Sequence, residues 1–96
     1  MKIHESAENY LETILMLSKK QSYVRSIDIA NELNFSKPSV SVAMKNLKAH
    51  DYITVSDEGY ITLTDSGHQL ARAIYERHSL MTKFLVYLGG DPELAR

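Results

Sequence analysis

Two short helical patterns separated by about three residues constrain the fold more than any other feature of this sequence. The first pattern covers residues 26–33, and Ser26 is expected to be its N-cap. Asn34 follows, and asparagine tolerates the left-handed backbone that often ends a helix. The second pattern starts almost at once, with Ser36 as the expected cap and Pro38 in the first turn, where its missing N–H would have no partner anyway. This arrangement predicts a helix-turn-helix.

The stretch that holds the second helix, FSKPSVSVAMKNLKAH at residues 35–50, contains no Asp or Glu. Its three lysines give it a formal charge of +3, which leaves −4 for the remainder of a chain whose net charge is −1. On a helical wheel one face is apolar and is expected to be buried: Val40, Ala43, Met44 and Leu47. The opposite face combines small residues with lysines: Pro38, Val42, Lys45 and Ala49, flanked by Ser41 and Lys48. Such a surface can approach phosphates closely.

Seven residues at the start and on the outer face of this helix are the predicted DNA-binding residues: Ser36, Lys37, Pro38, Ser39, Ser41, Val42 and Lys45. The lysines should mainly neutralise phosphate, while the hydroxyls can donate to phosphates or base edges. Val42 can lie against a thymine methyl group in a major groove. Lysine-rich surface helices are also common in proteins that bind no DNA, so charge by itself leaves the function open.

The hydrophobic period changes after this helix. Residues 53–56 and 60–63 alternate between apolar and polar side chains, which predicts a β-hairpin with one buried face and Gly59 at a positive φ in its turn. A hairpin directly after a recognition helix is the winged variant of the motif. Asp57 and Glu58 occupy the expected tip, and phosphates would repel them. The wing should therefore contribute little affinity, with any contacts left to Thr54, Ser56, Tyr60 or Thr62.

Longer helical patterns flank this motif. One runs from Ser6, its expected cap, to about Lys20, and the other runs from a cap at Thr64 or Asp65 to about Leu88, on the order of 35 Å. Residues 91–96 then begin like another helix, which suggests a fragment of a longer protein. The predicted fold class is mainly α with a small β-hairpin. Residues 1–64 would form a winged helix-turn-helix domain, and residues 65–96 a long helix leading to a metal-binding and dimerisation region that is missing or truncated.

Composition and motifs exclude several function classes. The chain has no cysteine, so disulfides, thiolate metal sites and cysteine nucleophiles are all excluded. It has no signal peptide and no apolar run near the ~20 residues that cross a bilayer, so a soluble, cytoplasmic protein is expected. No nucleophile–base pairing, glycine-rich phosphate loop or catalytic carboxylate pair is recognisable, and an enzyme is not expected.

Several segments, taken in order, resemble the iron- and manganese-dependent repressors of the diphtheria toxin repressor family. They are ENYLETILML, DIANEL, SKPSVSVAMKNLKAHDYI, GYITLTDSG and YERHSLMTKFLVYLGGDPE, and together they extend over nearly the whole chain. The resemblance implies a homodimeric repressor that recognises a pseudo-palindromic operator in double-stranded DNA through the helix at residues 36–50. It also implies Mn²⁺ or Fe²⁺ as corepressor. The alternative is a winged-helix protein–protein interaction module that binds neither DNA nor metal.

The resemblance places metal ligands at Asn9, Glu12 and His78, with the remaining ligands in a helix that this chain begins and does not complete. In the iron-type branch an acidic residue four positions after the histidine serves a second site, and here that position is Thr82. The residues by themselves allow a different interpretation. His78 falls on an apolar stripe, where a lone histidine is more often a packed core residue, and Glu12 could be a solvated helix charge.

Overall fold

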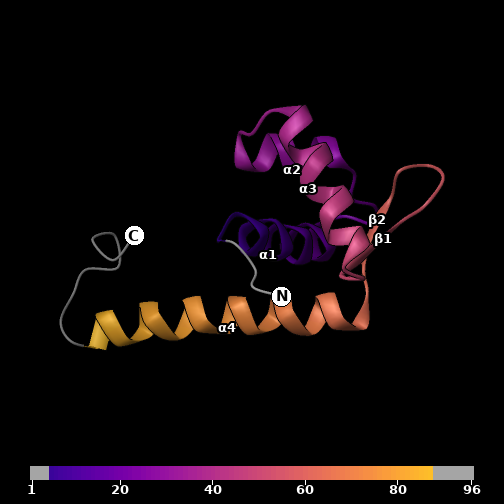
Figure 1. Cartoon of the computed structure of the whole chain (residues 1–96). Helices are drawn as coiled ribbons and strands as arrows, with labels where there is room; N and C mark the ends of the chain where they lie inside the picture. The colour runs from indigo at the N-terminus through magenta and orange to yellow at the C-terminus, as the bar shows by residue number, and fades with distance from the viewer. Residues whose placement is uncertain (1–4, 88–96) are drawn as a thin grey trace.

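The computed structural model describes the backbone of residues 5–87 and the side chains of residues 7–80. It contains α1 (Glu5–Lys20), α2 (Ser26–Leu33), α3 (Lys37–Ala49), β1 (Ile53–Val55), β2 (Ile61–Leu63) and α4 (Asp65–Tyr87). In Figure 1, α1 and α4 run side by side, α2 and α3 lie over the other side of α1, and the hairpin projects at one end. This order confirms the predicted fold class, mainly α with one small hairpin. The expected apolar positions from Met81 onwards, Thr82 and the helix start at residues 91–96 lie outside the described side chains.

One hydrophobic core joins all the elements, and α1 lies at its centre. Leu11 and Ile14 of α1 are completely buried, and α1 packs against α2, α3, β2 and α4. Ile29, Ile53 and Ile74 bring α2, β1 and α4 into the same cluster. Each apolar stripe therefore packs against α1 or an immediate neighbour, which fixes the helix-turn-helix and the long helix in one unit.

Two of the predicted N-caps are wrong. Ser26 is the first helical residue of α2, and the cap is Arg25, whose backbone N–H donates to the Asp28 carboxylate at 2.8 Å. Ser6 lies inside α1, which already begins at Glu5. In both places the serine predicted to cap the helix is itself a helical residue.

The turn between α2 and α3 follows the sequence prediction. Asn34 adopts a left-handed conformation with φ of 57°, and the Ser36 hydroxyl accepts the backbone N–H of Ser39 at 3.3 Å to cap α3. Phe35, between them, packs its ring edge-on against Tyr10 of α1 with centroids 5.8 Å apart. Burial raises the pKa of Tyr10. The turn is therefore held both by its own backbone and by a contact with α1.

The hairpin is antiparallel, with Ile53 opposite Leu63 and Val55 opposite Ile61. Ile53 and Ile61 are buried, so the predicted single buried face is confirmed. Each strand is one residue shorter than predicted, because residues 56 and 60 close the turn through a backbone hydrogen bond of 2.9 Å. Gly59 has the expected positive φ, 86°.

A tight junction connects the end of α3, the hairpin and the start of α4. Asp51 takes a φ of 61°, and its carbonyl accepts the Thr64 hydroxyl at 2.6 Å. The same hydroxyl oxygen accepts the N–H of Gly67 at 3.1 Å, which confirms Thr64 as the cap of α4. A Cβ at Gly67 would overlap the carbonyl oxygen of Tyr52. The first turn of α4 is therefore pressed against the residues that follow α3.

Within the part of the chain that the structure describes, we find no helix with the length and apolar character required to traverse a lipid bilayer.

Candidate nucleic-acid interface and metal site

Helix α3 has the two faces predicted from its sequence. Val40, Met44 and Leu47 are buried, with exposures of 5% or less. On the opposite side Val42 is 59% exposed, although it is apolar. The seven predicted DNA-binding residues are all exposed, from Ser36 to Lys45. The outer face of α3 is thus available to a partner and is not packed into the interior of the domain.

The lysines of α3 remain available for an anionic partner. Lys37, Lys45 and Lys48 are exposed, and no carboxylate belongs to the helix. The ion pairs between described residues join side chains of α1 and α4 or lie within α4, and none involves a lysine of α3. The positive charge of this face is therefore not neutralised within the described structure.

The N-terminal halves of α2 and α3 enclose a surface hollow of about 280 Å³. It is lined by Ser26, Ile27, Lys37 and Ser41. Ser26 and Ile27 were not among the sequence-predicted site residues, because only the packing of the two helices brings the start of α2 next to Lys37. Nearby, the Ser36 hydroxyl donates to the Ser39 hydroxyl at 2.8 Å, so these two predicted contacts form one hydrogen-bonded pair.

The described residues include a contact where the turn of the hairpin closes, at Tyr60, that sequence reasoning missed. Tyr60 stacks on Tyr23, with ring centroids 4.3 Å apart, and the Arg25 guanidinium lies 4.7 Å from the Tyr60 centroid. The acidic residues of the turn, Asp57 and Glu58, are exposed and immediately precede Gly59 and Tyr60 in the chain. The Arg25 guanidinium therefore adds a positive charge beside a turn that carries two carboxylates.

Glu12 and His78 meet across the seam between α1 and α4. The Nδ1 atom of His78 lies 3.1 Å from Oε2 and 3.2 Å from Oε1 of Glu12. His78 is about half exposed at 49%, so the alternative reading of a packed core histidine is wrong. The Glu12 side chain is only 19% exposed, which also contradicts a freely solvated charge. Glu8 and Arg77 pair beside them at 3.8 Å.

The donor atoms of Glu12 and His78 fit two ligand positions of one divalent ion. Neighbouring ligands of an octahedral ion at about 2.1 Å lie about 3 Å apart, close to the separation observed here. A carboxylate oxygen with an imidazole nitrogen suits Mn²⁺ or Fe²⁺. Asn9 lies one helical turn before Glu12 and is half-buried, so it shares that face of α1. No cluster of three or more His, Cys, Asp or Glu occurs among the described residues.

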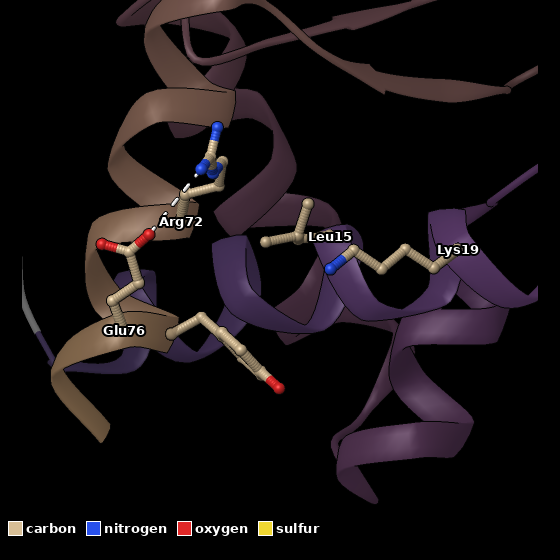
Figure 2. A pocket seen from close by; sticks show the side chains of 5 residues that line it. Leu15, Lys19, Arg72 and Glu76 are labelled. Carbon is tan, nitrogen blue, oxygen red and sulfur yellow. Dashed lines mark ion pairs between the residues drawn. The ribbon is translucent and has the colours of Figure 1, made fainter. Parts of the chain in front are cut away.

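Further along the same seam is a second hollow, of about 200 Å³. Figure 2 shows Leu15 and Lys19 on α1 facing Arg72 and Glu76 on α4. Arg72 pairs with Glu76 at 3.7 Å, and the Lys19 ammonium lies 5.4 Å from the ring centroid of Tyr75. The charged groups around this hollow already have partners, whereas the lysines of α3 take part in no ion pair between described residues.

The sequence of this chain is similar to those of known proteins. Residues 2–61 match the family described as iron dependent repressor, N-terminal DNA binding domain. The HTH-type transcriptional regulator MntR of Listeria monocytogenes is 34% identical over 87 residues, which is 91% of this chain and 61% of the relative. The transcriptional regulator MntR of Escherichia coli is 34% identical over 92 residues, 96% of this chain and 59% of the relative. The chain therefore spans about three-fifths of the length of these relatives.

The fold is also shared with solved structures. The crystal structure of ScaR with bound Zn²⁺ superimposes with a TM-score of 0.77 at 30% identity, over 88% of this chain and 40% of that chain. The structure of the manganese regulator SloR has a TM-score of 0.74 at 31% identity, over 84% of this chain and 38% of that chain. MepR, a transcription regulator of a multidrug efflux pump, aligns with a TM-score of 0.70 at 26% identity, over 91% of this chain and 66% of that chain.

Proposed function

This chain belongs to the iron-dependent repressor family, and on that premise we propose that it is the DNA-binding part of a metal-responsive transcriptional repressor. The observation that carries the proposal is the outer face of α3, which is exposed, positively charged and free of carboxylates. Its family consists of repressors and not of enzymes. The alternative of an interaction module that binds no DNA is not favoured by these relatives.

We assign the DNA contact to α3 lying in a major groove, which is wide enough to admit a helix. Lys37 and Lys45 neutralise phosphates, and Ser36 and Pro38 position the start of the helix near the backbone. Ser39, Ser41 and Val42 face base edges. The buried side of α3 supports this placement, because it fixes which residues can reach a partner.

The phosphate role of Lys45 predicts a change in salt dependence. The Lys45→Ala variant should weaken binding to specific and random duplexes alike and lower the slope of log K against log salt by about one. Lys20→Ala, which removes an exposed lysine from the end of α1, is the matched control. A slope that stays unchanged in the Lys45 variant would count against this assignment.

We assign the metal contact to Glu12 and His78, with Asn9 offering a neutral carbonyl oxygen. ScaR and SloR, which share this fold, are described as Zn²⁺-bound and as a manganese regulator respectively. A bound Mn²⁺ or Fe²⁺ would be coordinated by donors from two helices at once, and its positive charge would attract the carboxylate of Glu12. Glu12 holds its carboxylate in the seam and His78 reaches it from α4, so these two residues tie α1 to α4 at the site. The remaining ligands would belong to a region following the long helix.

We propose that residues 1–64 bind DNA, that residues 65–96 lead to a metal-binding and dimerisation region, and that the whole protein is a homodimer on a pseudo-palindromic operator. Two copies of α3 would then occupy successive major grooves about 34–36 Å apart. A repressor of this kind acts on bacterial DNA, so we place it in the cytoplasm.

The deciding experiment is a duplex selection followed by affinity measurement. The chain would select duplexes from a random library, and fluorescence anisotropy would compare the selected duplex with random sequence at a stated salt concentration, with and without Mn²⁺. We expect at least 10³-fold discrimination for the selected duplex. Equal affinity for selected and random duplexes would contradict the proposed function.

A further inference from the structure

The loop before α2 lies beside β2 and is joined to it by a backbone hydrogen bond. The N–H of Ile61 donates to the carbonyl of Val24 at 2.7 Å, and Val24 is buried. Side chains alternate along an extended segment, so Tyr23 and Arg25 project to the side opposite Val24. Arg25 has the extended backbone that this requires, with φ of −120° and ψ of 166°. Both of these side chains then contact the Tyr60 ring.

The Arg25 guanidinium is held in place without being neutralised. Its guanidinium carbon lies 4.7 Å from the Tyr60 centroid, and Tyr60 is itself braced by the stacked ring of Tyr23. Arg25 is exposed, and the ion pairs between described residues do not include it. A guanidinium that rests on an aromatic face keeps the N–H donors at its edge available for an anion.

Arg25 also adjoins the positively charged side of the helix-turn-helix. It directly precedes Ser26, which lines the hollow between α2 and α3 together with Lys37. The acidic tip of the hairpin, Asp57 and Glu58, is poorly suited to approach a polyanion. The positive charge on this side of the wing is carried by Arg25, which lies on Tyr60 where the turn closes.

We infer that Arg25, positioned by Tyr60 and Tyr23, contacts a backbone phosphate of the bound duplex and supplies the wing's part of the DNA interface. The inference rests on the proposed function and extends it, because it moves the contact from the tip of the wing to a residue outside the hairpin. Tyr60 and Tyr23 are positioning residues, which act on DNA through Arg25.

The test is the salt dependence of binding to the selected duplex. Arg25→Ala should lower the slope of log K against log salt by about one and weaken binding to random duplex in parallel. The control is Arg72→Ala, which removes an exposed arginine from α4 and should leave both the slope and the affinity unchanged. Thermal melts identify any variant that fails to fold, and Arg25→Gln, which keeps hydrogen-bonding capacity without the charge, provides a second measurement of the slope.

A double-mutant cycle separates positioning from a general structural effect. Tyr60→Leu should weaken DNA binding several-fold when Arg25 is present and have no further effect in the Arg25→Ala background. Equal losses in both backgrounds would overturn the positioning role of Tyr60.

The outcomes also separate this inference from the proposed function. A wild-type chain that discriminates its selected duplex, combined with unchanged slopes in both Arg25 variants, would overturn the inference and leave the proposed function standing. A wild-type chain that binds selected and random duplexes equally would overturn both.

Discussion

The outer face of α3 and the seam between α1 and α4 are two candidate sites of very different construction. The α3 face uses residues that are neighbours in the sequence, from Ser36 to Lys45, on one rigid helix. The proposed metal ligands are Glu12 and His78, which are 66 residues apart and come from two helices. Helical periodicity is enough to build the first site, whereas the second exists only when α4 packs against α1.

The two sites are mechanically connected through the junction at the start of α4. The Thr64 hydroxyl bonds the carbonyl that follows α3 and also caps α4, while Gly67 lies directly against the Tyr52 carbonyl. His78 lies three turns further along the same helix. Variants at these positions can therefore damage one site, the other or both.

The largest expected loss of stability comes from a substitution on the buried side of α3. Leu47→Ala should lower the free energy of unfolding by about 3 kcal/mol, because it removes a large side chain from the shared core. Val42→Ala, on the opposite face of the same helix, should change stability by less than about 0.5 kcal/mol but weaken binding to the selected duplex. Urea denaturation followed by circular dichroism measures the stability of both variants, and fluorescence anisotropy measures their binding to the selected duplex. Similar losses of stability in the two variants would refute the two-faced description of α3.

A substitution at the junction between α3, the hairpin and α4 should lower stability nearly as much. Gly67→Ala should lower the free energy of unfolding by about 2–3 kcal/mol, because the added Cβ overlaps a backbone carbonyl that cannot move freely. Ser66→Ala, at the exposed neighbouring position, is the control and should stay within about 0.5 kcal/mol. Thermal and urea denaturation would measure the difference. If the two variants are equally stable, the close packing of α4 on Tyr52 is not significant.

A smaller effect, limited to metal binding, is expected from a substitution in the seam between α1 and α4. Glu12→Gln should weaken Mn²⁺ binding tenfold or more, which is about 1.4 kcal/mol, because the anionic ligand is lost. It should leave metal-free binding to a random duplex unchanged, since Glu12 lies on α1, away from the outer face of α3. Isothermal titration calorimetry measures the metal affinity, and Glu32→Gln on the exposed side of α2 is the matched control. Similar metal affinities for the two variants would exclude Glu12 as a ligand.

The smallest effect tests the caps. Ser36→Ala should lower the free energy of unfolding by about 1 kcal/mol, because the Ser39 N–H loses its acceptor. Ser26→Ala should change stability by less than about 0.5 kcal/mol, since Ser26 is the first helical residue and not the cap. Chemical denaturation of the two variants side by side gives the comparison. A larger loss for Ser26→Ala than for Ser36→Ala would reverse the assignment of the caps.

The errors of sequence interpretation have a common physical origin. Ser6 and Ser26 have cap-forming side chains, but a helix begins where backbone geometry and neighbouring acceptors allow, and Asp28 supplies the acceptor for Arg25. The Tyr23–Tyr60–Arg25 contact was not predicted because it joins the loop before α2 to a turn residue about 35 positions away in the sequence. By contrast, Asn34, Ser36 and Gly59 were correctly assigned, since each satisfies a requirement of its own turn.

The sequence by itself determined the helices, the hairpin and the two faces of α3, because these depend on periodicity and turn chemistry over a few residues. It also supplied the family resemblance that pointed to Glu12 and His78. The tertiary structure alone decided that these two side chains meet at 3.1 Å and that Arg25 rests on Tyr60. Contacts between distant segments depend on how the α1 core orients each element, and no local pattern in the chain contains that information.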